Sequence, residues 1–374
     1  MGASGAQPFG AAQSIDDIPR SGNPFFEDWA LEAALRHLPR AGRSVEIAGA
    51  PSRATGIPLV RRLNLAPMLG SIWGIWSHIH CFDTTPDGRI DAETLLDEVL
   101  AFVRRRNGKL LYWQDLPVDT PFLSELIQYL SARGLHFEAT RTRMRPLFDA
   151  RDKSGPDAKA ARLEGKRMAE LRRCRRRLHE TGRVSTAIYR GRHDPNLWMD
   201  AFLRLEASGW KGRTGTAIAC NDAERAFFNS LMRHAADRGQ VLVCSLEVDS
   251  QPMAMTLNLR AGQGLWGFKT AYCNSVSRYS PGALVACETA LAALTDPTIA
   301  WIDSCMDHDG GPLGKLWHHR RTTVDLMIST SRTSNVLPRL ARPSLAVLRG
   351  VKAMMKPLRE TPFGSVPARA DGRQ

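Results

Sequence analysis

Arg278-Tyr-Ser-Pro-Gly-Ala283 joins a strand-like run at residues 264–273 to a helix-like run at residues 283–294. Ser280 is a favourable residue just before a helix, and Pro281 is favourable at its first position. The backbone amides of that first turn lack partners within the helix and attract anions such as phosphate. The same residues also fit a plain helix start with a solvated arginine. The rest of the chain has to decide between these interpretations.

The length and composition of the chain are typical of a globular protein with two domains. Its 374 residues exceed the size of one ordinary core, and 43% of them are hydrophobic while 24% are charged. No apolar run reaches the ~18–20 residues that cross a bilayer, and residues 1–13 lack the basic and apolar regions of a secretory signal. We therefore expect a cytoplasmic protein.

The net charge of +13 predicts an anionic partner, such as a phosphorylated cofactor, a nucleic acid or an acidic membrane surface. The positive charge is densest at residues 166–177, where seven basic side chains accompany a single acid, Glu170. We interpret this run as a solvated helix between domains. Nucleic-acid binding is not expected, because no aromatic residues for base stacking are interleaved with the charges.

We divide the chain into five parts. Residues 1–22 are predicted to be disordered, 23–150 to form an α/β half, 151–160 a polar hinge, 161–332 a second α/β domain, and 333–374 a basic amphipathic and disordered tail. The helix expected near residues 344–359 either docks on its own domain or lies on an anionic membrane.

Metal-binding patterns are weak throughout the chain. His78 and His80 alternate as on a strand, but no third ligand is nearby in the sequence. The seven cysteines show no C-x-x-C pair and no zinc-ligand spacing. We assign no metal site and expect the cysteines to be reduced.

The order of elements expected in residues 161–332 is helix, three antiparallel strands, phosphate-type turn, helix, strand, helix, strand. Five motifs accompany this order: E-A-S-G-W-K-G-R-x-G-T-A (206–217), L-E-V-D-x-x-P-M-A (246–254), K-T-A-Y (269–272), R-Y-S-P-G (278–282), and I-D (302–303) before K-x-W (315–317). Together they resemble the GNAT acyltransferases associated with cellulose and exopolysaccharide biosynthesis. The N-terminal half resembles a degenerate GNAT-like domain, as in Fem-type aminoacyl transferases. The resemblance implies an α/β (α+β) fold with tandem GNAT-like domains and a mixed central sheet flanked by helices.

The same resemblance implies that acetyl-CoA or another acyl-CoA is the donor. Where the usual pattern of the pyrophosphate loop is Gln/Arg-x-x-Gly-x-Gly/Ala, Pro281 replaces the first glycine and removes one amide donor. The cofactor-binding residues implied are Arg278, Tyr279, Ser280, Gly282 and Ala283. The substrate-binding residues implied are Trp210, Lys211, Arg213, Lys269 and Lys315.

Acyl transfer needs a base for the acceptor and an acid for the leaving thiolate. Asp303, at the end of a strand expected at residues 299–304, is the first candidate for a base or an acceptor-orienting carboxylate, and a loop-capping Asp explains it equally well. Tyr272 is the candidate acid, although a strand-edge residue is also a fitting description. Glu247 is a second candidate carboxylate, for which a buried salt bridge is the alternative.

The expected function is transfer of an acetyl or other acyl group from an acyl-CoA to an amine or hydroxyl acceptor, in polysaccharide or cell-envelope biosynthesis. Two alternatives stay open. One is a Fem-like aminoacyl transferase that uses charged tRNA. The other is a non-catalytic accessory protein in peripheral contact with an anionic membrane.

Overall fold

The computed structural model describes residues 22–41, 45–48, 57–64, 70–75, 92–191, 193–306 and 311–339. The predicted disorder at the N-terminus, His78 and His80, and the amphipathic segment of the tail lie outside these residues. None of the helices in the described ranges is long and apolar enough to cross a membrane.

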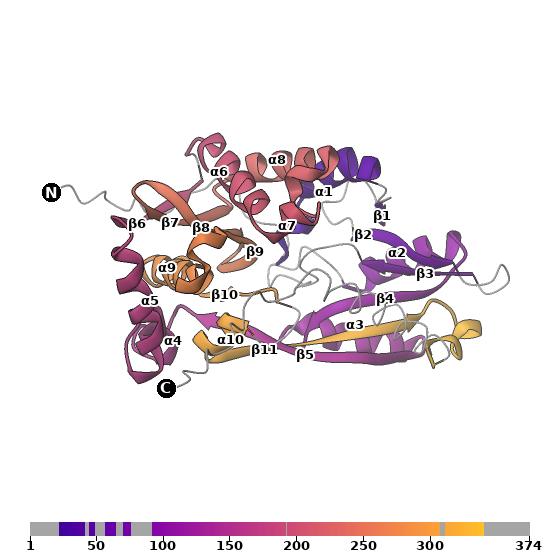
Figure 1. Cartoon of the computed structure of the whole chain (residues 1–374). Helices are drawn as coiled ribbons and strands as arrows, with labels where there is room; N and C mark the ends of the chain where they lie inside the picture. Colours follow the sequence, from indigo (N-terminus) through magenta and orange to yellow (C-terminus); the bar gives the residue numbers. More distant parts are fainter. Residues whose placement is uncertain are drawn as a thin grey trace, which may run out of the picture.

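Eleven strands of the described chain form one mixed sheet, which runs through the whole molecule (Figure 1). Only the pairs β3–β4 and β9–β10 are parallel among its neighbours. In spatial order the strands are β1 (Glu46–Ala48), β2 (Ile57–Asn64), β3 (Ser71–Ile75), β4 (Gly108–Pro117), β11 (His319–Ser329), β5 (Phe137–Asp149), β10 (Trp301–Asp303), β9 (Gly264–Tyr272), β8 (Gln251–Ala261), β7 (Val241–Val248) and β6 (Val184–Arg190). The mixed sheet flanked by helices confirms the predicted fold class.

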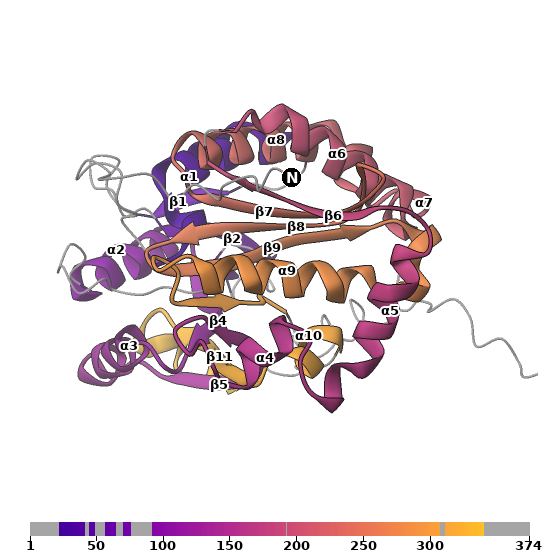
Figure 2. The ribbon, with the colours of Figure 1, turned by 90° about the vertical axis from the view of Figure 1, so that its left-hand side faces the viewer.

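Helices cover both faces of the C-terminal part of the sheet (Figure 2). One layer consists of α1 (Asp28–His37), α6 (Pro195–Ser208) and α8 (Asp222–Asp237), which share a core with β7, β8 and β9. The opposite layer consists of α4 (Pro156–Ala161), α5 (Ala169–His179) and α9 (Pro281–Thr295). The N-terminal part packs α2 (Ala92–Arg105) and α3 (Pro121–Ala132) on β4 and β11. The short helices α7 (Trp210–Arg213) and α10 (Gly311–Leu316) complete the described elements that matter for the site.

By its position in the sequence, helix α1 belongs to the predicted N-terminal half. It nevertheless packs on the C-terminal half. Trp29, Ala30 and Ala33 are buried in the same core as Phe228 and Leu231 of α8. The apolar face of α1 is therefore covered by the half that begins after residue 160.

The segment predicted as a polar hinge, residues 151–160, packs against the rest of the protein, and helix α4 begins within it. Asp157 is buried, and it accepts the backbone N–H of His318 and pairs with Nδ1 of His319 at 2.8 Å. Ala158 and Ala160 belong to the same core as α9. These contacts fasten residues 156–161 to both α9 and the start of β11.

The last strand of the sheet, β11, lies between β4 and β5, which both belong to the N-terminal half. Strand β5 then pairs with β10 on its other side. The predicted boundary at residues 151–160 therefore separates two parts of the sequence that share a single sheet.

Candidate active site

Strand β10 is only three residues long, and it pairs with just the first part of β9. Trp301, Ile302 and Asp303 pair in parallel with residues 264–266, whereas β9 continues to Tyr272 alongside β8. The β8–β9 register shifts so that one extra residue, Phe268, stands in β9; such a bulge bends a strand. In the described structure, the second half of β9 therefore has no strand partner on the side where β10 lies.

Gly267 directly follows the last residue of β9 that pairs with β10. A Cβ atom at this position would lie 3.0 Å from the carbonyl oxygen of Ser304, so the backbones approach closely there. The chain that leaves β10 therefore passes β9 at a tight contact that a glycine permits.

The turn at residues 278–283 connects this open strand edge to α9. A 3₁₀ helix, η6 (Asn274–Tyr279), follows β9, and Ser280 adopts the left-handed conformation with φ 51° and ψ 49° before the helix begins at Pro281. The amides of Ala283 and Leu284 both donate to the carbonyl oxygen of Ser280, at 3.0 and 3.1 Å. Pro281 has no N–H, so the first turn offers the amide of Gly282, for which no acceptor is found among the described residues.

The side chains of the turn divide into exposed and buried groups. Arg278 is exposed, and its guanidinium lies 4.8 Å from the ring centroid of Tyr279. Tyr279 and Ala283 are buried, while Ser280 is exposed. Of the five cofactor-binding residues predicted here, Arg278, Ser280 and the backbone of Gly282 are accessible to a ligand.

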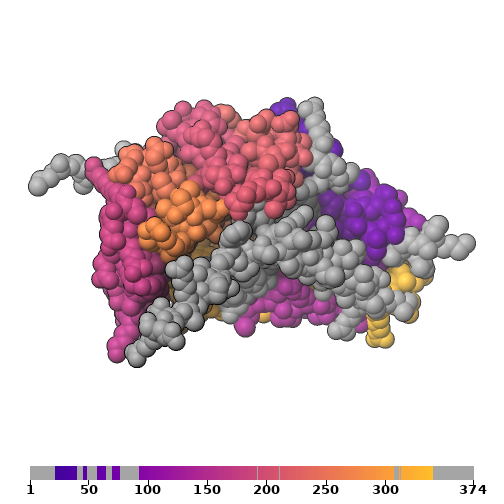
Figure 3. Space-filling view, in the orientation of Figure 1, coloured from indigo at the N-terminus to yellow at the C-terminus, as the bar shows by residue number. Residues whose placement is uncertain are grey.

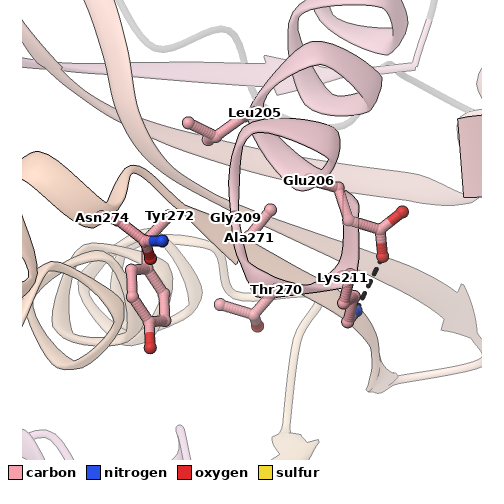
Figure 4. Close-up of a pocket in the computed structure, with 8 residues that line it drawn as sticks. All are labelled: Leu205, Glu206, Gly209, Lys211, Thr270, Ala271, Tyr272 and Asn274. Carbon is pink, nitrogen blue, oxygen red and sulfur yellow. Dashed lines mark hydrogen bonds and ion pairs between the residues drawn. The ribbon is translucent and has the colours of Figure 1, made fainter. Parts of the chain in front are cut away.

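A small pocket of about 40 Å³ lies beside the open half of β9 (Figure 4). The Lys211 ammonium lies 2.7 Å from Oε1 of Glu206, which is 4% exposed, and Oε2 of the same carboxylate accepts the N–H of Ile218 at 2.9 Å. Glu206 thus fastens the loop after α6 at two points. The residues that line the pocket are Leu205, Glu206, Gly209, Lys211, Thr270, Ala271, Tyr272 and Asn274.

Tyr272 links this pocket to the start of α9. Its side chain is 39% exposed, and a Cβ atom added at Gly282 would lie 3.6 Å from its ring. The predicted residues Lys211 and Tyr272 are therefore brought together, next to the turn that begins at Arg278.

Asp303 is the last residue of β10, and its side chain points into an ion-pair cluster. Its carboxylate is completely buried and pairs with Nε of Arg145 at 2.7 Å and Nη1 of Arg321 at 3.0 Å. It also accepts the N–H of Cys305, two residues later, at 2.8 Å, which is a loop-capping contact. Burial raises the pKa of this carboxyl, but the charges of Arg145 and Arg321 outweigh that effect and hold the pKa below 3.8. A buried carboxylate with a lowered pKa is a weak base, so the geometry does not favour proton abstraction by Asp303.

The remaining predicted site residues do not line the pocket. Glu247 lies on β7, with β8 between it and β9. Lys269 places its ammonium 5.5 Å from the ring of Phe268, and Lys315 is exposed on α10. Arg213 is exposed on α7, and the side chain of Trp210 lies outside the described part of the structure.

Glu206 is the pocket residue that the sequence reasoning missed. It follows Met199, Phe202 and Leu203 along the buried stripe of α6, at the position where another apolar residue is expected. An acid that continues an apolar stripe needs a buried partner, and Lys211, five residues later, supplies it. This break in the pattern is the signal by which the residue could have been found.

No three His, Cys, Asp or Glu side chains within the described ranges gather in a way that could hold a metal ion.

Comparison with known proteins extends these observations. Residues 165–310 match the family described as acetyltransferase (GNAT) domain, and this stretch contains β6 to β10 and the turn at residues 278–283. No curated protein sequence matches the chain.

Similar solved structures cover most of the chain. FemX aligns with a TM-score of 0.54 at 11% identity, over 87% of this chain and 96% of its own. The C-terminal domain of a putative lysylphosphatidylglycerol synthetase from Agrobacterium fabrum gives 0.52 at 13% identity, over 87% and 94%. L-PGS from Bacillus licheniformis gives 0.50 at 11% identity, over 88% and 99%. At such identities the likeness shows the fold alone. Residues 165–310 of this protein therefore match an acetyltransferase domain of the GNAT type, and they lie within a fold that resembles these three structures.

Proposed function

We propose that the protein transfers an acetyl or other acyl group from an acyl-CoA to an amine or hydroxyl acceptor. The observation that carries this proposal is the open edge of β9 next to the turn into α9. The extended arm of an acyl-CoA can pair with such an edge, while its pyrophosphate meets the amide of Gly282 and the guanidinium of Arg278. The thioester then lies near Tyr272 and the pocket.

The pocket supplies groups for the chemical step. The acceptor nitrogen or oxygen attacks the thioester carbon, the C–S bond breaks, and the Tyr272 hydroxyl protonates the leaving thiolate. The pocket has room for a water molecule, which takes the proton of the acceptor and passes it to bulk solvent, from which Tyr272 regains the proton that it gave to the thiolate. Lys211, held by Glu206, attracts an anionic group of the acceptor.

We extend the proposal to acceptors of polysaccharide or cell-envelope biosynthesis, which the resemblance of the five sequence motifs supports. The net charge of +13 favours an acceptor that carries negative charge.

Calorimetric titration with acetyl-CoA and with free CoA tests the donor. Both should bind to the wild-type protein, and Arg278→Glu should weaken both by at least tenfold, because a charge-assisted hydrogen bond is lost and a repulsion is added. Arg105→Glu, which makes the same charge change at an exposed position of α2, is the matched control and should bind like wild type. Binding of neither ligand to the wild-type protein would refute the proposal.

A tRNA-dependent aminoacyl transfer is the second candidate, because FemX shares the fold and α5 carries exposed arginines. Salt-sensitive binding of charged tRNA, together with no affinity for CoA in the same titration, would favour this second candidate.

A further inference from the structure

The basic helix α5 lies directly beside the turn that begins at Arg278. Figure 2 shows α5 next to the end of α9 that follows β9, and Figure 3 shows the magenta surface of this region at one edge of the molecule. Cys174 and Leu178 are buried on the inner side of α5, in the core that also contains the first turns of α9. The helix is therefore packed on one side and presents its arginines on the others.

Two contacts fix how α5 is rotated. The thiol of Cys174 interacts with the hydroxyl of Ser280, at the start of α9. Arg175, about 100° further around the helix, reaches Glu288 at 3.3 Å, two turns into α9. The side of α5 opposite Arg175 therefore points away from the body of α9, beyond its first residue. Arg173 and Arg177 lie on that flank, about 100° and 60° from Cys174 in the other direction.

The arginines of α5 differ in the contacts that their side chains already make. Arg172 donates to the carbonyl oxygens of Leu163 and Gly165. Arg173 pairs with Glu170 at 2.6 Å, but both side chains are about half exposed, so the pair opens at little cost in free energy. Arg177 is exposed, and no ion pair or hydrogen bond of its side chain is found within the described ranges. Two guanidinium groups are thus available beside the turn.

We propose that Arg177, together with Arg173, binds the 3′-phosphate on the ribose of CoA. This inference rests on the proposed function, because it assumes that the pyrophosphate occupies the turn at Ser280–Gly282. The adenosine part of the ligand then extends away from the protein, past the start of α9, where the flank of α5 stands. A phosphate monoester carries close to two negative charges, and arginine binds its oxygens through paired hydrogen bonds. On this proposal, the basic run at residues 166–177 has a specific ligand.

Titration with CoA and with 3′-dephospho-CoA tests the subsite. The wild-type protein should bind CoA about tenfold more tightly than 3′-dephospho-CoA, and this ratio should fall as salt is raised. Arg177→Gln should bring the affinity for CoA close to that for 3′-dephospho-CoA, and should leave the affinity for 3′-dephospho-CoA unchanged. Arg176→Gln is the matched control, because it removes the same charge from the neighbouring position, which points away from the turn. It should keep the ratio.

Equal binding of the two ligands to the wild-type protein would overturn the subsite while leaving the acyl-CoA donor in place. An equal loss of the ratio in Arg177→Gln and Arg176→Gln would also overturn it, because the effect would then come from the general charge of the helix. Binding of neither ligand, with or without binding of tRNA, would overturn both the subsite and the proposed donor.

Discussion

At the scale of single residues, buried charges hold together strands that are far apart in the sequence. Asp303 of β10 joins Arg145 of β5 and Arg321 of β11. The guanidinium of Arg321 also lies 4.4 Å from the ring centroid of Trp301. Each charge in this cluster has lost most of its hydration, so removal of one member weakens the compensation of the others.

Asp303→Asn should lower the free energy of unfolding at pH 7 by about 3–5 kcal/mol, because two buried arginines lose the buried carboxylate that they share. The pKa of Asp303 is lower in the folded protein than in the unfolded chain. Its stabilising contribution is therefore complete above the unfolded value, near 3.8, and disappears as the pH falls through the folded value. Urea unfolding of both proteins as a function of pH measures this difference, which should shrink below about pH 4.

Asp119→Asn is the control for this prediction. Asp119 also pairs with Arg321, at 3.2 Å, but its side chain is 46% exposed, so the substitution should change stability by less than about 1 kcal/mol. Equal effects of the two substitutions would contradict the role given to the buried cluster.

At the scale of elements, the loop between α6 and α8 depends on a close backbone approach. A Cβ atom at Gly212 would lie 1.8 Å from the carbonyl oxygen of Ala207, whereas a Cβ atom at Gly215, with φ +67°, would meet no atom within 4 Å. Lys211 precedes the first of these glycines and reaches back to Glu206. The position of the pocket lysine thus depends on the path of α7.

Gly212→Ala should displace α7 and separate Lys211 from Glu206. We expect faster limited proteolysis of the loop and unchanged affinity for CoA, because the turn at Ser280 is not affected. Gly215→Ala should only add backbone strain of about 1–2 kcal/mol and leave the loop protected. Similar cleavage rates in the two variants would contradict this account of the loop.

At the scale of the whole molecule, the shared sheet makes the two halves depend on each other. The apolar side chains of β11, such as Val324, Leu326 and Ile328, are buried in the core of the N-terminal half, and β10 has β5 as a neighbour. A fragment that ends or begins near residue 160 exposes these surfaces to water.

A fragment of residues 161–339 should therefore fail to fold cooperatively, whereas residues 22–339 should unfold in a single transition. Circular dichroism during urea unfolding, compared with tryptophan fluorescence, checks both statements, because Trp113 and Trp266 lie in the cores of different halves. A fragment with its own sharp transition would show that the halves fold independently.

Several parts of the fold and the site followed from short stretches of sequence. The predicted strand at residues 264–273 and helix at 283–294 correspond to β9 and α9, because strand propensity, a proline at the first helical position and apolar periodicity act over a few neighbouring residues. The turn between them, and with it the acetyltransferase resemblance, depends on the same local chemistry.

Other features were decided by the tertiary structure. The arginines that hold Asp303 lie 158 and 18 residues away, and the buried role of Glu206 depends on a loop that folds back. The insertion of β11 between β4 and β5, and the position of α5 beside the turn, come from packing that joins distant segments. Local propensity determined where elements begin and end, whereas burial of apolar surface and pairing of buried charges determined which elements meet, since these energies depend on the whole chain.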